Sequence, residues 1–203
     1  DYTVVQNEQH CELLNLLIDE AGAHFETAGS LRGGRETFVT MKLPRTLTLA
    51  GAAAAVNAEQ RVRMVDKIRD ALGGLEGTTV GFLGLSFKPN TNDLREAPAL
   101  SIAQLLMDQG VTVRAYDPAA LEEGSKLLPR ITPCQNAYET ARGADAIVLM
   151  TEWNEFRNLD FDQLKSVMRR AILIDLRNVY ESSRVTQFGF RHVSVGRPTK
   201  NPG

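Results

Sequence analysis

The spacing of hydrophobic positions predicts one long helix over residues 49–72. An alanine run opens this segment. The apolar residues that follow, from Val56 to Leu72, stand three, four or six positions apart, and charged residues fill the other side. Gly73 and Gly74 come directly afterwards, and glycine is common where a helix ends. The helix therefore leads into the next part of the chain, where the pattern is different.

Beyond Gly77 the sequence alternates between short apolar runs and amphipathic stretches. The apolar runs predict buried strands at residues 79–85, 111–116, 144–150 and 171–176. The amphipathic stretches predict helices at residues 99–109, 137–142 and 161–169. Buried strands that alternate with helices are typical of a parallel sheet covered on both faces. With right-handed crossovers, the sequence predicts an α/β fold, an open doubly wound parallel sheet of the Rossmann-like kind.

The residues before position 47 predict a small α+β segment. Apolar residues have helical spacing over residues 12–21, and residues 38–43 alternate as a strand does. These elements are too few to bury a core of their own. We therefore divide the chain into an N-terminal segment of residues 1–46, a connecting helix of residues 47–74, an α/β domain of residues 75–198 and a frayed tail of residues 199–203.

Composition narrows the classes of protein and partner. Of 203 residues, 43% are hydrophobic and 24% are charged, as in ordinary globular proteins, and the formal net charge of −2 offers no cationic field to nucleic acid or anionic lipid. The longest apolar stretch, residues 47–56, is too short to span a bilayer. Cys11 and Cys134 lie far apart, and no CxxC pair or metal spacing of histidines occurs. We expect a cytoplasmic protein with a small-molecule partner, no nucleic acid or membrane partner, and no metal.

Four loops at the carboxyl ends of the predicted strands carry the candidate chemistry, since open parallel sheets bind their ligands there. The first loop, residues 86–98, is long, and no Gly-rich dinucleotide turn follows its strand. It carries an aromatic ring at Phe87, an ammonium at Lys88 and a guanidinium at Arg95. Together these groups suit a phosphorylated ligand that contains a ring.

Two of these candidates also have a plainer interpretation. Phe87 stands at a strand end, where an aromatic side chain often belongs to the core. Arg95 stands beside Asp93 and Glu96, with which it can form a solvated charge cluster near a helix start. Spacing alone does not decide between the two interpretations.

The other three loops carry further candidates. Arg177 follows the last predicted strand, where the alternative is that Asp175 neutralises it. Asp117 ends the second strand, as the ribose-binding acid of dinucleotide folds does, but the Gly-rich turn that accompanies that role is missing. Trp153 is more typical of packing at a strand end than of ligand stacking. No cluster of nucleophile and base is present in sequence, so we predict no catalytic residue.

Three segments together resemble the C-terminal part of the UDP-glucose/GDP-mannose dehydrogenase family. They read GFLGLSFKPNTNDLREAPALSIAQLLMDQGVTVRAYDP, GADAIVLMTEWNEFRNLD and ILIDLRNVYESSRVTQFGFRHVSVGR. The resemblance runs from about Ala50 to Pro198, and its most specific motifs are FKPNTNDLRE, TEW and DLRN. It implies an enzyme that oxidises the C6 alcohol of UDP-glucose to the carboxylate of UDP-glucuronate, in two NAD-dependent steps through a cysteine-bound intermediate.

The resemblance also implies roles for individual residues. Phe87 and Lys88 fall where the family contacts the nucleotide sugar, and Arg177 falls where it contacts substrate. Arg95 falls where the family reaches the NAD cofactor from its second domain. The segment 49–72 is similar to the family's central helix, which implies a homodimer.

Residues 1–46 do not resemble this family. Its Gly-rich dinucleotide domain and its nucleophilic cysteine segment have no counterpart there, and Cys11 does not fit that segment. Part of this stretch instead looks faintly similar to a phage- or plasmid-encoded family of unknown function. We therefore expect a fragment or fusion that binds a UDP-sugar and is inactive as a dehydrogenase by itself. The alternative is an interaction module in which residues 49–72 drive self-association and the nucleotide pocket is vestigial.

Overall fold

The computed structural model describes residues 24–31, 36–42 and 49–203, with side chains described from residue 56 onward. The chain divides into two compact units between Gln60 and Arg61. The division falls within α2 (Leu49–Leu72), whose bounds are those predicted from its apolar spacing. The second half of this helix is therefore part of the unit that follows it.

In the first unit, β1 (His24–Leu31) and β2 (Glu36–Lys42) pair as an antiparallel hairpin. The second of these strands confirms the one predicted over residues 38–43. The sequence pattern did not predict β1. The helix predicted over residues 12–21 lies outside the described residues.

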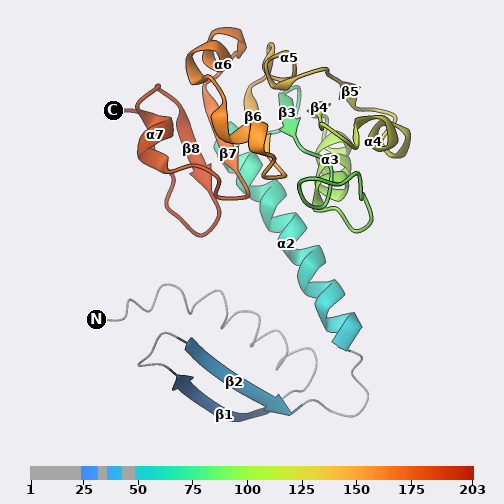
Figure 1. Ribbon diagram of the computed structural model, residues 1–203, viewed down its shortest axis with the longest axis vertical. Helices are drawn as coiled ribbons and strands as arrows, with labels where there is room; N and C mark the ends of the chain where they lie inside the picture. The colour runs from blue at the N-terminus through green and yellow to red at the C-terminus, as the bar shows by residue number, and fades with distance from the viewer. Residues whose placement is uncertain (1–23, 32–35, 43–48) are drawn as a thin grey trace. The chain divides into compact units, whose positions relative to one another are not determined.

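The second unit is built around a six-stranded sheet in which neighbouring strands are parallel. Its strands are β3 (Thr79–Leu83), β4 (Thr112–Tyr116), β5 (Thr132–Pro133), β6 (Ala146–Leu149), β7 (Ile172–Asp175) and β8 (Arg191–Ser194). Their order is β5-β4-β3-β6-β7-β8 (Figure 1). The chain builds outward from β3 to β5, returns to β6 and builds outward on the other side. This arrangement confirms the predicted open doubly wound α/β fold.

Helices cover both faces of this sheet. They are α3 (Pro98–Asp108), α4 (Leu121–Leu127), α5 (Ala137–Ala141), α6 (Phe161–Val167) and α7 (Ser182–Thr186), with a 3-10 turn, η3 (Asn154–Asn158). Buried side chains of α2 and α3 pack on one face, and those of α5, α6 and α7 pack on the other. The second half of α2 is therefore one of the layers of the α/β unit.

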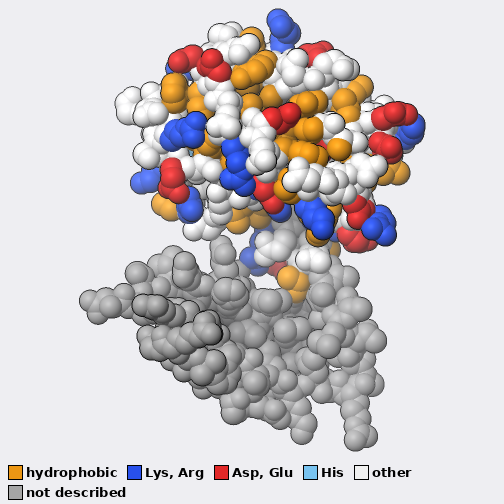
Figure 2. Space-filling model, viewed as in Figure 1, with side chains coloured by type: hydrophobic (Ala, Val, Ile, Leu, Met, Phe, Trp, Pro, Cys, Tyr) orange, Lys and Arg blue, Asp and Glu red, His pale blue; other side chains and the backbone are white. Residues whose placement is uncertain are grey.

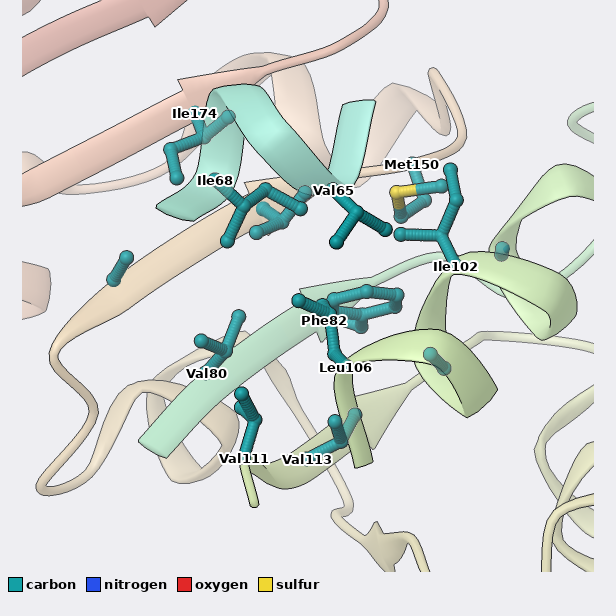
Figure 3. Packing of buried hydrophobic residues seen from close by; sticks show 14 of the residues in the cluster. Val65, Ile68, Val80, Phe82, Ile102, Leu106, Val111, Val113, Met150 and Ile174 are labelled. Atoms are coloured by element: carbon teal, nitrogen blue, oxygen red, sulfur yellow. The ribbon is translucent and has the colours of Figure 1, made fainter. Parts of the chain in front are cut away.

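Alternation along β3 explains how one strand serves both cores. Val80 and Phe82 point to the face where Ile68 of α2 and Leu106 of α3 lie (Figure 3), and Leu83 belongs to the opposite cluster. All of these side chains are fully buried. The central strand is thus covered on both sides, as its continuous apolar run predicted.

Gly81 allows α5 to approach β3 closely. A Cβ atom at this position would lie 2.5 Å from Ile147 Cδ1 and 2.9 Å from the carbonyl oxygen of Thr140, which belongs to α5. No side chain fits between the helix and the strand. The glycine in this apolar run therefore serves helix–sheet packing, not a turn.

Local sequence fixes where several of the shorter helices begin. Asn136 caps α5, where its side-chain oxygen accepts the backbone N–H of Glu139 at 2.8 Å. Asp160 caps α6 in the same way and accepts the N–H of Gln163 at 3.0 Å. Pro98 stands in the first turn of α3, where its missing N–H leaves no bond unmade.

Two arginines from distant segments complete the C-terminal end of α2. Arg170 donates from Nη1 to the carbonyl oxygen of Leu72 at 2.9 Å, and Arg191 donates from Nη1 to that of Ala71 at 2.9 Å. Both carbonyls belong to the last turn, where the helix itself supplies no donor. Positive charge is also favourable at this end of the helix dipole.

The structure adds elements to the pattern read from the sequence and corrects it at the end of the chain. β5, β8, α4 and α7 were not predicted. The tail is not frayed at Lys200, because the backbone groups of Lys200 and His192 exchange two hydrogen bonds of 2.8 and 2.9 Å.

Lys, Arg, Asp and Glu side chains are interspersed on the visible face (Figure 2), which agrees with the small net charge. No described helix is long and apolar enough to cross a membrane.

Candidate functional site

The strand order reverses between β3 and β6, and the loops that leave these two strands form the centre of the candidate site. Ligands of open parallel sheets bind in the crevice at such a reversal. Gly84 directly follows β3 and has a φ of +96°, which residues with a side chain rarely adopt. A Cβ atom here would lie 2.5 Å from Thr151 Cβ. Only glycine lets the chain turn out of the sheet so close to the end of β6.

A buried carboxylate, Asp117, holds the start of the first loop. Its Oδ2 accepts the backbone N–H groups of Leu85 and Ser86, at 2.7 and 2.9 Å, and the Ser86 hydroxyl at 2.8 Å. Its Oδ1 accepts the N–H groups of Ala119 and Ala120, at 2.9 and 2.8 Å. Burial alone would raise the pKa of Asp117, but these backbone N–H groups outweigh burial and lower the pKa below its usual value.

Ser86 is bonded to the end of β6 as well. Thr151 Oγ1 donates to the carbonyl oxygen of Ser86 at 2.6 Å, and Trp153 Nε1 donates to its hydroxyl oxygen at 3.2 Å. Trp153 also packs against the apolar cluster on the α5 and α6 side. Ser86 therefore links the ends of β3, β4 and β6, and Trp153 has a packing role and a polar role.

Beyond Ser86 the loop closes on itself and exposes two of the predicted residues. The N–H of Phe87 donates to the carbonyl oxygen of Asp93 at 2.9 Å, and the N–H of Asp93 donates to Thr91 Oγ1 at 3.1 Å. Asn90 takes a positive φ of 62° between them. Phe87 is 48% exposed and Lys88 is exposed, so Phe87 is not a core residue at a strand end. An aromatic ring and an ammonium are thus both presented to solvent from one short turn.

Arg95 is held by Asp93 in the same loop. Its Nε and Nη2 donate to the two carboxylate oxygens at 2.9 and 2.8 Å, although the Arg95 side chain is 89% exposed. The Arg95 hydrogen bonds lower the pKa of Asp93 to about 2, with a smaller contribution from the charge of Lys88. The charge cluster foreseen as the alternative for Arg95 is therefore present, with Asp93 as the partner and with Glu96 turned to Arg61 at 3.5 Å.

Arg177 lies at a second position along the same edge, at the carboxyl end of β7. Its Nε donates to Glu152 Oε2 at 2.6 Å, and this bond lowers the pKa of Glu152. Asp175 accepts the backbone N–H of Arg177, not its guanidinium, so it is not the neutralising partner. The two side chains line an open hollow of about 410 Å³ together with Arg157, Leu176, Asn178, Val179 and Val195.

The arrangement brings the predicted residues to one edge of the sheet at two positions. Phe87, Lys88 and Arg95 share the loop after β3, and Arg177 follows β7, two strands further along. Neighbouring strands lie about 4.8 Å apart, so the two positions are separated by roughly 10 Å of sheet edge. An elongated ligand can span that distance. Contact of all four residues with one ligand stays a prediction.

Sequence reasoning missed the partners that organise this edge. Ser86, Thr151 and Glu152 lie in the loops to which the sequence pointed, but their partners could not be identified, because the fold brings each partner from another strand end. Arg157 was missed because it lies in η3, which the apolar pattern does not predict. Among the described residues, Cys134 is a buried free thiol and no group of His, Cys, Asp and Glu side chains could hold a metal.

Comparison with known families divides the sequence in two. The UDP binding domain of the UDP-glucose/GDP-mannose dehydrogenase family matches residues 81–182. A domain of unknown function, DUF932, matches residues 1–59. The end of that second match falls next to the boundary between the two compact units, Gln60 and Arg61.

Two curated relatives show the extent of the sequence similarity. The UDP-glucose 6-dehydrogenase of Rhizobium meliloti is 41% identical over 186 residues, which cover 87% of this chain and 43% of the relative. That of Pseudomonas aeruginosa is 39% identical over 154 residues, which cover 72% of this chain and 34% of the relative. The chain thus spans less than half of either relative. The first alignment covers more than residues 47–203 contain, so it extends into the segment that the sequence resemblance had left out.

Solved structures share the fold. A UDP-glucose dehydrogenase from Pyrobaculum islandicum aligns with a TM-score of 0.58 and 30% identity, over 66% of this chain and 29% of that one. An NDP-N-acetyl-D-galactosaminuronic acid dehydrogenase from Methanosarcina mazei Go1 aligns with a TM-score of 0.67 and 26% identity, over 83% of this chain and 34% of that one.

Proposed function

Because this chain belongs to the UDP-glucose/GDP-mannose dehydrogenase family and carries its UDP-binding domain, we propose that it binds a UDP-sugar, with UDP-glucose as the leading candidate, at the carboxyl edge of the sheet. The observation that carries this proposal is the loop after β3, which presents Phe87 and Lys88 to solvent at the point where the strand order reverses. Each group then has a distinct task.

The tasks follow from the chemistry of the side chains. The exposed ring of Phe87 offers an apolar face to a base or sugar ring, and Lys88 offers an ammonium to diphosphate oxygens. Arg177, in its hollow, offers a second cation farther along the edge. Of these cations, Lys88 has no hydrogen-bond or ion-pair partner within residues 56–203, whereas Arg177 must leave or share Glu152. Lys88 is therefore the primary phosphate contact.

Oxidation of UDP-glucose with NAD is proposed for the longer enzyme to which such a domain belongs, since this chain spans 43% of the Rhizobium meliloti relative. The described residues do not fit NAD by themselves. Asp117 stands where dinucleotide folds keep their ribose-binding acid, but its carboxylate is already used by five donors of its own chain. Arg95, 89% exposed at the rim, is the group we assign to contact with NAD held by another segment.

We also propose that α2 forms a homodimer contact, in a cytoplasmic enzyme. Val62 of α2 is 51% exposed, whereas Val65 and Ile68 of the same helix are buried, so Val62 offers an apolar contact on the face that the α/β unit does not cover. Light scattering is expected to give a dimer, and Val62→Glu is expected to give monomers. A wild-type chain that dimerises but binds no UDP would favour the interaction module over the nucleotide-binding domain.

Replacing Lys88 with alanine is expected to weaken UDP binding by about 1–3 kcal/mol, because a charge-assisted bond to a phosphate oxygen is lost. Calorimetric titration of UDP into the full chain measures the change. Lys126→Ala is the matched control, since Lys126 is also an exposed lysine but pairs with Glu122 in α4. No binding to the folded wild type at millimolar UDP would overturn the proposed function. An equal effect of the two substitutions would remove Lys88 from the site.

Replacing Glu152 with glutamine is expected to strengthen UDP binding, in contrast to the substitution of Lys88. Loss of the carboxylate removes the partner of Arg177 and frees its guanidinium for an anionic ligand, so UDP affinity should rise about threefold to tenfold. Arg177→Ala should lower the affinity in the same titration. Glu122→Gln, which breaks a pair with Lys126 elsewhere on the surface, controls for the change in net charge. A Glu152→Gln protein with unchanged or weaker affinity contradicts the competition between Glu152 and ligand.

A further inference from the structure

We propose that Asp117 is a positioning residue for ligand binding: through Ser86 it fixes the loop that carries Phe87 and Lys88, and Trp153 senses the state of that loop. The proposal rests on the proposed function, since it concerns the same nucleotide site. It assigns a task to a buried acid that neither nucleotide contact nor the apolar core explains.

The first step is the way Asp117 joins two strand ends. Three of its five hydrogen bonds come from Leu85 and Ser86 after β3, and two come from Ala119 and Ala120 in the turn that follows β4. All five donors belong to the carboxyl edge. The carboxylate therefore sets where the loop after β3 leaves the sheet relative to β4.

The second step is that only a carboxylate can accept all five donors. Asparagine keeps one acceptor oxygen and puts an NH₂ donor in place of the other. In either orientation of the amide, this donor faces backbone N–H groups, and at least two of the bonds are lost. Asp117→Asn changes neither the size of the side chain nor the covalent path to Lys88, so it acts on the loop through hydrogen bonding.

The third step is the direct link from Ser86 to the ligand groups and to Trp153. Ser86 immediately precedes Phe87 and Lys88 in the chain. Its hydroxyl donates to Asp117 and accepts the indole N–H of Trp153. Trp153 is the one tryptophan of the sequence, so its emission reports on this bond without interference from other indoles. A shift of Ser86 therefore moves the ligand groups and changes the tryptophan signal together.

A buried acid at the opposite edge supplies the control. Asp145 is 4% exposed, accepts the backbone N–H of Thr79 at the start of β3 at 2.9 Å, and pairs with Arg169 at 2.7 Å. It anchors the other end of the same strand. Asp145→Asn should lower stability as Asp117→Asn does, but it leaves the carboxyl edge intact.

The test compares the wild-type chain of 203 residues, Asp117→Asn and Asp145→Asn by UDP titration, thermal unfolding and tryptophan emission. Asp117→Asn is expected to weaken UDP binding about tenfold or more and to shift Trp153 emission, and Asp145→Asn is expected to stay within about twofold of wild-type affinity with unshifted emission. Equal losses of affinity in both variants at equal loss of melting temperature would overturn the proposal, because they would mean a structural role alone.

Ser86→Ala keeps the test decisive if Asp117→Asn does not fold. It retains the backbone bonds of Ser86 to Asp117 and Thr151 and removes only the hydroxyl between Asp117 and Trp153. We expect a shift in Trp153 emission and about threefold weaker UDP binding. Unchanged emission together with unchanged affinity would overturn the proposal.

Amide hydrogen exchange separates failure of this inference from failure of the proposed function. If the wild type binds no UDP, the proposed function is wrong, and exchange without ligand still decides whether Asp117 fixes the loop. Faster exchange over residues 85–94 in Asp117→Asn, with β3 itself protected as in wild type, supports the inference. Exchange over these residues that is the same in Asp117→Asn as in the wild type overturns the inference, whether or not the wild type binds UDP.

Discussion

A chain that begins at residue 75 is expected not to fold, whereas one that begins at residue 61 should keep the whole α/β unit. Val65, Ile68 and Leu72 of α2 are each at most 5% exposed and belong to the core cluster that includes the sheet and α3. Figure 3 shows Val65 and Ile68 in this cluster. Full burial of such a side chain is worth about 1.5–3 kcal/mol, so losing the three removes about 5–9 kcal/mol. This is comparable to the total stability of a domain, about 5–15 kcal/mol.

The measurement is the thermal melt and near-UV circular dichroism of the two truncated proteins. The piece starting at residue 61 should melt cooperatively, and the piece starting at residue 75 should show no cooperative transition. A cooperative melt of the shorter piece would restore the boundary at residue 75 that the sequence pattern had suggested. It would also mean that the contacts of α2 are peripheral to the core.

Replacing Gly84 with alanine is expected to destabilise the α/β unit by about 3 kcal/mol, since two costs add. Alanine at positive φ costs about 1–2 kcal/mol, and forcing a methyl group into a filled space costs about 1–3 kcal/mol more. The space is filled because Thr151 Oγ1 and the Thr151 backbone nitrogen lie 2.6 and 2.8 Å from the new Cβ position. The melting temperature should fall by about 6–12 °C.

Gly143→Ala is the matched control for this substitution. Gly143 has a φ of +69° but no atom within 4 Å of a Cβ position, so it carries the backbone cost without the contact with a neighbour. Its melting temperature should fall by about half as much. Equal falls in melting temperature for the two variants would mean that Thr151 moves away from the methyl group without loss of stability. The close contact between Gly84 and Thr151 would then not be a constraint on the fold.

The parts of the fold that the sequence predicted are those whose signal is local. Of the four central strands, β3, β6 and β7 were predictable because they are buried on both faces and so read as nearly continuous apolar runs. β4 was predictable because its buried residues alternate with more exposed ones. β5 consists of Thr132 and Pro133, both exposed, and no apolar run marks it. α4 contains Gly124, which disfavours a helix but leaves room for Leu85, whose Cδ1 lies 2.7 Å from the position of a Cβ atom there.

In the candidate site, too, residues with a local signal were predicted and contacts between distant segments were not. Phe87 and Lys88 could be singled out because they follow a recognisable strand and because the proline after them restricts the backbone conformation of the loop. Glu152 is 25 residues from Arg177, and Asp117 is 31 residues from Ser86, so neither contact could be read before the strand order was known. Spacing along the sequence supplied the cations and Asp93 as a partner of Arg95, but not Glu152, the carboxylate that pairs with Arg177.

The arginines that complete α2 stand 98 and 120 residues after the carbonyls that they cap. A polypeptide emerging from the ribosome at about 5–20 residues per second must therefore extend for about 5–25 s before this helix end finds its donors. Through that interval the sheet that covers the apolar stripe of the helix is still incomplete. The newborn chain is thus exposed to chaperones and proteases for a time set by translation, whatever the speed of folding once the last strand is free.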